Sequence, residues 1–344
     1  MRTLVISDLH LGSRLGHDVL RHQDALSRLL AAIDGIERLV LLGDILELLQ
    51  GRARAAAAIA APVLREIGRR LGPEREVLVV AGNHDRPLVR RWVRALGPAL
   101  TPQTLVPPNA TPALAALVEW LAPARVSISY PGAWLSERVW ATHGHYLDHH
   151  LIPVSGYGIT RGRLRLSSAD AASPAEYERA RRPTVGRAAG SLPRPLAVLL
   201  DDAAELARAA TMPTLKRRLL RPPLSPLTAM LLGFQMQRAS IPALLRVVQR
   251  LGIDADWVVF GHVHRLGPLA ADDSAQWQGP GARPRIANSG SWLYEPLLVH
   301  RANAPHPYWP GGAVVHEDGA DPQAIGLLDD LDRETLAHRH GEAR

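Results

Sequence analysis

The sequence predicts an α/β fold built on parallel strands. Three short apolar runs, 4–6, 39–42 and 77–80, alternate with helical patterns over 18–33 and 52–71. Continuous apolar runs of this length are expected for strands buried on both faces, as in parallel sheets. The order strand, helix, strand, helix, strand is the one that produces parallel pairs, because a helix carries the chain back between strands.

The elements that follow are defined by caps and by further apolar runs. Thr111 and Pro112 fit the N-cap and first position of a helix that Pro123 closes. Later strands are expected at 126–130, 139–142, 257–260, 285–288 and 292–299.

The middle of the chain, 151–250, is predicted to be a mostly helical insertion. Ser173, Pro174 and Glu176 supply the N-cap, early proline and glutamate of a capping box. Apolar residues recur at helical spacing beyond them, and strand signals are scarce. Further helices are therefore expected over 196–207, from 225, and over 241–248.

We expect one domain over 1–320 that contains the insertion, followed by a tail over 321–344 with a short surface helix. No apolar run reaches the roughly eighteen residues that a membrane span needs, so no transmembrane segment is expected. The N-terminus lacks the apolar region of a signal peptide, which predicts a cytoplasmic location.

Positive charge is concentrated in the insertion. The chain carries a net charge of +7. Residues 151–250 contain 16 Lys and Arg against 6 Asp and Glu, a net +10, which leaves −3 for the remainder. Such a segment favours an anionic partner: a phosphorylated small molecule or lipid, nucleic acid, or the inner face of a membrane. A solvated arginine-rich surface explains the same charge, and the sequence leaves both open.

Polar residues suited to metal binding follow five of the predicted strands. They occur as Asp8-Leu9-His10, Gly43-Asp44 with Glu47, Gly82-Asn83-His84-Asp85, His143-Gly144-His145 and Gly261-His262-Val263-His264. The carboxyl ends of strands are where ligands bind in open α/β sheets, so these clusters are expected to converge. Cysteine is absent, so any metal must be held by His, Asp, Glu or Asn.

Together these five blocks resemble the calcineurin-like metallophosphoesterase superfamily, whose motifs are D-x-H, G-D-x-x-D/E, G-N-H-D/E, a histidine followed by glycine, and G-H-x-H. The resemblance covers about 1–150 and 255–298. It implies a four-layer αββα sandwich of two mixed sheets with a pair of metal ions at one edge. It also implies two ligand sets: Asp8, His10 and His264 for one ion, Asn83, His143 and His262 for the other, with Asp44 bridging the two.

The resemblance implies a hydrolase in which a metal-bridged hydroxide attacks a phosphodiester or pyrophosphate. The donor set suits Mn²⁺ first, with Fe, Zn or Co as alternatives. His84 resembles the family's catalytic histidine, and Glu47 is placed to hydrogen-bond it. Four neighbours are expected around the site, as partners of the ligands or of the substrate: Asp85, Arg86, His145 and Asp148. The roles of His149 and His150 stay open.

Three functions remain at this point. The first is a phosphodiesterase or pyrophosphatase that acts on a phosphorylated small molecule or lipid. The opening Ser7-Asp8-Leu9-His10-Leu11-Gly12 and the insertion look like the branch of UDP-2,3-diacylglucosamine pyrophosphatases, although that branch commonly has arginine in place of His84. A nuclease of the SbcD type shares all five blocks, but the insertion lacks the interleaved aromatic residues that stack bases. The third is a non-catalytic scaffold. Scaffold members of the superfamily usually lose the catalytic histidine or metal ligands, whereas every motif position is filled here.

Overall fold

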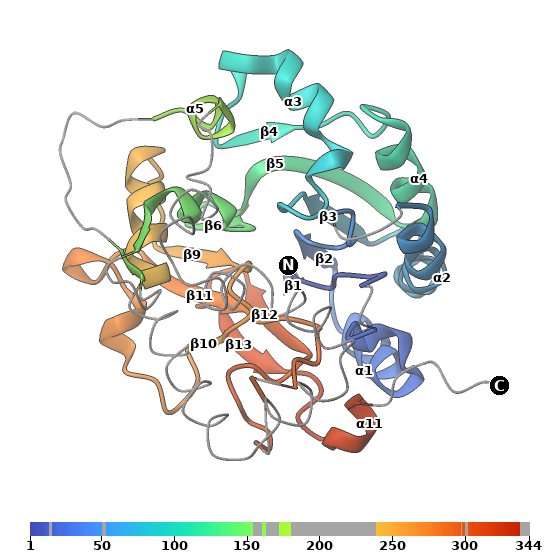
Figure 1. The fold of residues 1–344 in the computed structure, drawn as a ribbon. Coiled ribbons are helices and arrows are strands. Elements are labelled where there is room, and N and C mark those ends of the chain that lie inside the picture. The colour runs from blue at the N-terminus through green and yellow to red at the C-terminus, as the bar shows by residue number, and fades with distance from the viewer. Residues whose placement is uncertain are drawn as a thin grey trace, which may run out of the picture.

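The structure is a computed structural model that describes residues 1–13, 16–49, 53–153, 160–162, 172–179, 239–296, 298–299 and 302–337. Figure 1 shows its strands stacked in the middle of the molecule and its helices outside them.

The described strands form one hydrogen-bonded network of eleven, in the order β10-β11-β9-β6-β5-β3-β2-β1-β12-β13, with β4 paired to β5. A separate hairpin joins two more, β7 (Leu151–Pro153) and β8 (Thr160–Gly162). The bounds in the network are β1 Arg2–Ile6, β2 Arg38–Leu42, β3 Glu76–Val80, β4 Gln103–Leu105, β5 Arg125–Ser136, β6 Val139–Thr142, β9 Trp257–Phe260, β10 Leu266–Gly267, β11 Arg285–Ser289, β12 Gly312–Glu317 and β13 Gln323–Gly326.

Strand β5 divides this network into two sheets. Its first half pairs in parallel with β3, from Arg125 to Ser129, while its second half, from Gly132, pairs antiparallel with β6. The first sheet holds β1, β2 and β3 side by side and parallel. In the second sheet β6, β9 and β11 are parallel neighbours. Both sheets also contain antiparallel pairs, so both are mixed.

Alternation along the strands separates three apolar cores. On β2, Val40 lies in the core between the two sheets, whereas Leu39 and Leu41 face helices. On β9, Val259 joins the same central core and Val258 faces outward into a third cluster. Successive side chains of a strand point to opposite faces, so each sheet is covered on both sides.

Helices form the two outer layers. On one side lie α1 (Gln23–Ile33), α2 (Ala53–Leu71) and α4 (Pro112–Trp120), and on the other lies the helical segment 239–250. The predicted four-layer αββα sandwich is therefore confirmed. The remaining described helices are α3 (Arg90–Leu96), α5 (Pro174–Arg179) and α11 (Arg333–Ala337).

The predicted caps account for where two helices begin. The hydroxyl of Thr111 accepts a hydrogen bond from the backbone N–H of Leu114 at 3.2 Å, and α4 starts at Pro112. At α5, the backbone N–H of Ser173 donates to Glu176 Oε1 at 3.3 Å, as in a capping box. The predicted helices over 196–207 and from 225 lie outside the described residues.

The prediction of a strand over 292–299 is wrong. The described residues of this range form a loop, in which Leu293 makes one isolated bridge to Asp18. Its apolar character has another cause: the side chains of Trp292 and Val299 are fully buried in the core under the first sheet. Six of the described strands were not expected from the sequence: β4, β7, β8, β10, β12 and β13. Because β13 pairs with β12, the sheet extends into the range assigned to a tail.

No helix among the described residues combines the length and apolarity needed to cross a membrane.

Replacing Leu39 by alanine is expected to lower the free energy of unfolding by about 2–5 kcal/mol, because it leaves a cavity in a packed core. Its side chain is fully buried, whereas Leu105 on β4 is 69% exposed. Leu105→Ala is the matched control and should change stability by less than about 0.5 kcal/mol. Urea unfolding of both variants measures the difference, and equal losses would contradict the layer assignment.

Candidate metal centre

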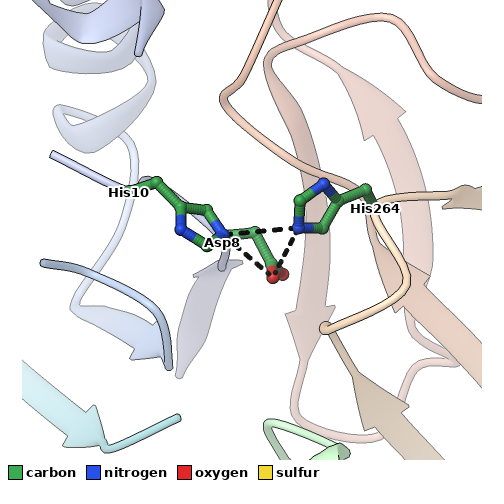
Figure 2. Close-up of side chains that lie close together, drawn as sticks. All are labelled: Asp8, His10 and His264. Atoms are coloured by element: carbon green, nitrogen blue, oxygen red, sulfur yellow. Dashed lines mark hydrogen bonds and ion pairs between the residues drawn. The ribbon is translucent and has the colours of Figure 1, made fainter. Parts of the chain in front are cut away.

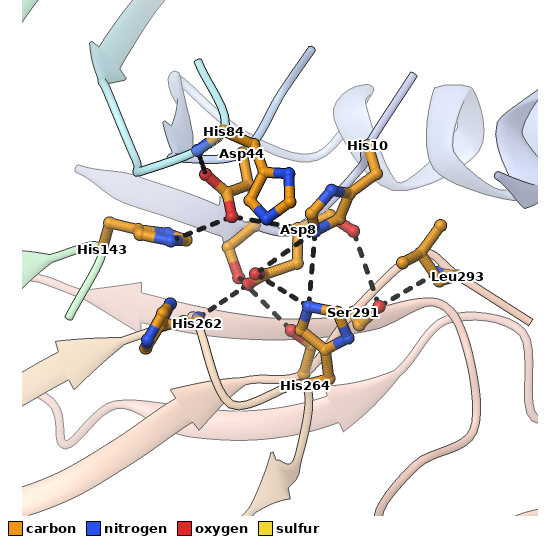
Figure 3. A network of polar contacts seen from close by, with 12 residues as sticks. Asp8, His10, Asp44, His84, His143, His262, His264, Ser291 and Leu293 are labelled. Atoms are coloured by element: carbon orange, nitrogen blue, oxygen red, sulfur yellow. Dashed lines mark hydrogen bonds and ion pairs between the residues drawn. The ribbon is translucent and has the colours of Figure 1, made fainter. Parts of the chain in front are cut away.

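Seven side chains from five strand ends meet at one edge of the sandwich. Chain segments that follow β1, β2 and β3 contribute from the first sheet, and segments that follow β6 and β9 contribute from the second. Figure 3 shows the carboxylates and imidazoles of these segments turned toward one another. They are Asp8, His10, Asp44, Asn83, His143, His262 and His264, the set expected from the sequence.

One group consists of Asp8, His10 and His264, whose ligand atoms all lie within 4.8 Å of one another. His264 Nε2 is 3.2 Å from Asp8 Oδ1, and His10 Nε2 is 3.9 Å from the same oxygen. The two Nε2 atoms are 3.3 Å apart, as Figure 2 shows. Three donors therefore enclose one small volume.

A second group consists of Asp44, His143 and His262, again with ligand atoms within 4.8 Å of one another. His143 Nε2 lies 3.2 Å from Asp44 Oδ2 and 3.1 Å from the amide oxygen of Asn83. Asp44 Oδ2 is also 3.7 Å from His10 Nε2, in the first group. The carboxylate of Asp44 therefore lies between the two groups.

The backbone at this edge adopts an unusual conformation. Six non-glycine residues in the described chain have positive φ, and five of them belong to the set above: Asp8, His10, Asp44, His262 and His264. Left-handed φ is uncommon for residues with a Cβ, and such strain concentrates at functional sites. The tight turns that it creates aim successive donors into one space.

Two glycines allow these loops to approach one another. A Cβ at Gly82 would collide with the Asp44 carboxylate, and one at Gly261 would collide with Ser7 and with the Asp8 carboxylate. The glycines that precede Asn83 and His262 in the motifs are therefore explained by close contact, since neither has a positive φ.

Each of the four imidazoles has a hydrogen-bond acceptor at its outer nitrogen. His143 Nδ1 lies 3.0 Å from the carbonyl oxygen of Leu42. Each of the other three rings lies beside a carboxylate. His10 Nδ1 is 3.1 Å from Glu47 Oε2, His264 Nδ1 is 2.8 Å from Glu295 Oε1, and His262 Nε2 is 2.8 Å from Asp148 Oδ1. An acceptor at the outer nitrogen leaves the inner nitrogen as a lone pair, the state in which histidine binds metal.

The residues present fit divalent ions. With their Nδ1 atoms beside carboxylates, His10 and His264 can both offer Nε2 to one cation, and the two Nε2 atoms lie 3.3 Å apart. Carboxylate, imidazole and amide donors without thiolate suit Mn²⁺, Fe, Zn²⁺ or Co²⁺.

Charge at the site is strongly negative without such ions, and the pKa values reflect this. Burial lowers the pKa of His143, but the Asp44 carboxylate outweighs burial and raises that pKa to about 9. Burial raises the pKa of Asp8, but nearby His264 and His143 outweigh it and lower the pKa to about 2. Protons on imidazole thus supply positive charge that a metal ion would otherwise provide.

His84 lies beside both groups. Its Nδ1 is 2.7 Å from Glu47 Oε2, and its backbone N–H donates to Asp44 Oδ1 at 2.8 Å. Glu47 therefore contacts both His10 and His84 with the same oxygen. The contact with His84 is the one expected from the sequence. Burial lowers the pKa of His84, but the hydrogen bond to Glu47 outweighs burial and raises it.

The structure brings Asp85 and Asp148 to the site but directs Arg86 elsewhere. Asp85 is fully buried, and it accepts hydrogen bonds from the backbone N–H of Ile45 at 2.8 Å and of Gly82 at 2.5 Å. It makes no side-chain cap with the short helix that follows it. Burial raises the pKa of Asp85 to about 7.

Arg86 pairs with Glu178 of α5, part of the predicted insertion. The carboxylate of Glu178 also accepts hydrogen bonds from the hydroxyls of Tyr130 at 2.5 Å and Tyr146 at 2.9 Å. His145 lies next to this network, with Nε2 3.3 Å from the Tyr130 hydroxyl. The insertion is therefore attached to the loop that carries His84.

His149 and His150 contact α5 through Tyr177. The Nε2 atom of His150 is 2.8 Å from the Tyr177 hydroxyl, and the ring of His149 packs edge-on against the same tyrosine.

Sequence reasoning missed Glu178 and Glu295. Neither lies in a motif, and each reaches its partner from a loop or short helix far along the chain. The one available signal for Glu295 was its position four residues after Ser291, in the segment that follows the last motif.

Comparison with known proteins agrees with this geometry. The family model for calcineurin-like phosphoesterases matches residues 1–170 of this chain. Members of that family are phosphoester hydrolases that typically bind divalent metal ions. None of the curated proteins compared with the chain matches it.

Two solved structures illustrate how distant the structural relatives are. Nuclease MPE of Pseudomonas putida is 22% identical with a TM-score of 0.25, and the match covers 41% of this chain and 53% of that one. The chain thus spans about half of that nuclease. A cold-active protein-tyrosine phosphatase of a Shewanella species is 12% identical with a TM-score of 0.33, covering 92% of this chain and 75% of that one. At such TM-scores neither likeness defines an activity for this chain.

Asp44→Asn is expected to reduce metal loading, because it removes charge from the carboxylate between the two groups. Elemental analysis after reconstitution with Mn²⁺ measures the equivalents bound. Asp318→Asn is the control, since that carboxylate is exposed and pairs with the N-terminal amine. Two full equivalents in the Asp44 variant would exclude a shared ligand.

The metal-free protein is expected to lose stability as pH rises from about 6.5 to 9. The folded pKa of His143 lies above the unfolded value of 6.5, so its contribution is complete below 6.5 and disappears as pH passes 9. Melting temperatures in chelator across this range test the prediction. His143→Gln should flatten the decline, and an unchanged slope would contradict the assignment.

Proposed function

We propose that this chain is a divalent-metal-dependent hydrolase of phosphodiester or pyrophosphate bonds. One ion would be held by Asp8, His10 and His264, and a second by Asn83, His143 and His262. Asp44 would contact both ions. The observation that carries the proposal is the position of Asp44 Oδ2, 3.7 Å from a nitrogen of the first group and 3.2 Å from one of the second.

Two ions bound there, Mn²⁺ first among the metals that these donors suit, would lower the pKa of a bound water and neutralise phosphoryl oxygens. The chain's own contribution lies in orientation and proton transfer. Outer acceptors fix each ligand ring, so the donors are in place before a substrate enters.

His84 is the proposed general acid. Its Nδ1 is held by Glu47, which leaves Nε2 to donate a proton to the leaving oxygen. The hydrogen bond to Glu47 raises the pKa of His84 by stabilising the charged ring, and this favours the protonated form that a general acid needs. The backbone hydrogen bond to Asp44 fixes the loop and thus the distance between the acid and the ligand groups.

The insertion over 151–250 is proposed to border the substrate as a cap on the sandwich domain that contains it. The contact between Glu178 of α5 and Arg86, two residues after His84, supports this placement. A phosphorylated small molecule, a nucleotide-linked lipid at a membrane surface and nucleic acid are the three substrate classes that its positive charge favours.

A hydrolysis screen with Mn²⁺ tests the proposal. Its arms are bis-p-nitrophenyl phosphate, p-nitrophenyl phosphate, cyclic nucleotides, UDP-linked lipids in vesicles, and single- and double-stranded DNA. Turnover of the diester but not the monoester supports the proposed reaction. DNA cleavage that falls steeply with salt would instead identify a nuclease, and no turnover in any arm would indicate a scaffold.

His84→Ala is expected to lower diester hydrolysis by about 10²- to 10⁴-fold while metal content is retained, as for loss of a general acid. His22→Ala is the control, because that ring lies outside the site and makes no side-chain cap with α1. Steady-state rates are measured beside elemental analysis. A change below about fivefold would remove His84 from the mechanism.

A further inference from the structure

The carboxylate of Glu295 is the outer partner of His264. Glu295 Oε1 lies 2.8 Å from His264 Nδ1, and the side chain of Glu295 is 24% exposed. On the other side of the same ring, Nε2 faces Asp8 and His10 (Figure 2). The ring therefore lies between one carboxylate outside the ligand group and another inside it.

The loop that carries Glu295 is attached to the segment after β1. The backbone N–H of Trp292 donates to the carbonyl of Asp8 at 3.1 Å, and that of Tyr294 donates to the carbonyl of His17 at 2.8 Å. The indole of Trp292 is fully buried and donates to the carbonyl of Gly312 at 3.1 Å. Glu295 follows this anchored stretch directly, so its backbone is held in place.

The loop is fixed on the far side of Glu295 as well. The carbonyl of Glu295 accepts hydrogen bonds from the backbone N–H groups of Leu298 at 2.9 Å and Val299 at 3.1 Å. Val299 is fully buried in the core. Anchors on both sides make the carboxylate a rigid reference for the imidazole, which is the property that a ligand-orienting group needs.

His264 needs such a group more than His143 does. The ring of His143 is fully buried, and its acceptor is the backbone carbonyl of Leu42. The side chain of His264 is 22% exposed, so packing encloses its ring less completely than that of His143. A hydrogen bond to Glu295 selects the tautomer with the proton on Nδ1 and turns Nε2 inward.

We propose that Glu295 is a positioning residue that holds His264 with Nε2 directed at Asp8 and His10, and so sets the affinity of this group for a divalent ion. The inference rests on the proposed function only in taking that group as a metal site. It assigns a role to a residue beyond the range that the family model matches.

The test is Mn²⁺ binding to the full chain, freed of metal with chelator and titrated by calorimetry. Glu295→Ala is expected to weaken one equivalent by about 10- to 100-fold and leave the other unchanged. Glu295→Gln keeps an oxygen acceptor for Nδ1 and should recover most of the affinity. Glu317→Ala is the matched control, because that glutamate pairs with Arg2 at an exposed position.

The melting temperature of the metal-free variants separates orientation from folding. An unchanged melting temperature together with weaker binding in Glu295→Ala supports the inference. Binding equal to wild type overturns it, and so does an equal loss of affinity and stability in both Glu295 variants. If wild type itself binds no Mn²⁺, the proposed metal centre fails; if wild type binds two equivalents and Glu295→Ala does the same, only the role of Glu295 fails.

Discussion

The buried carboxylates of Asp8 and Asp44 are the constraint on which the rest of the site depends. Two negative charges in a dry interior are unfavourable unless donors surround them. Each carboxylate uses one oxygen to hold a neighbouring loop: Asp44 Oδ1 accepts the N–H of His84 at 2.8 Å, and Asp8 Oδ2 accepts the N–H of His262 at 2.9 Å. The other oxygen faces the imidazoles. The same groups therefore assemble the loops and create the negative potential that attracts cations, so folding and metal binding are linked.

The sandwich provides the geometry for this arrangement. Parallel strands β1, β2 and β3 end at one edge of the first sheet, and β6 and β9 end at the corresponding edge of the second. Strand β5 passes from one sheet into the other and fixes their relative position. The apolar core between the sheets brings the two sets of strand ends together. No single loop contains a complete group of donors, which makes the site a property of the whole fold.

Much of this could be read from sequence, because periodicity and motifs are local. Apolar runs predicted most of the buried strands, and the polar residues predicted to follow them are the ones that the structure brings together. What could not be read depends on contacts between distant segments. Glu295 and Glu178 carry no motif, since any acidic residue on a suitably placed loop would serve. The apolar stretch at 292–299 suggested a strand, but burial of Trp292 and Val299 in a loop gives the same composition. Residues of β13 are only partly buried, so no apolar pattern marks them.

The left-handed backbone at Asp8, His10, Asp44, His262 and His264 ties the chemistry of the site to its local handedness. Aspartate, asparagine, histidine and glycine enter this region with comparatively little strain, whereas β-branched side chains enter it at high cost. Few residue types should consequently be tolerated at these five positions. A variant of this chain that keeps these turns should therefore keep aspartate, asparagine, histidine or glycine at the five positions, whatever the site binds.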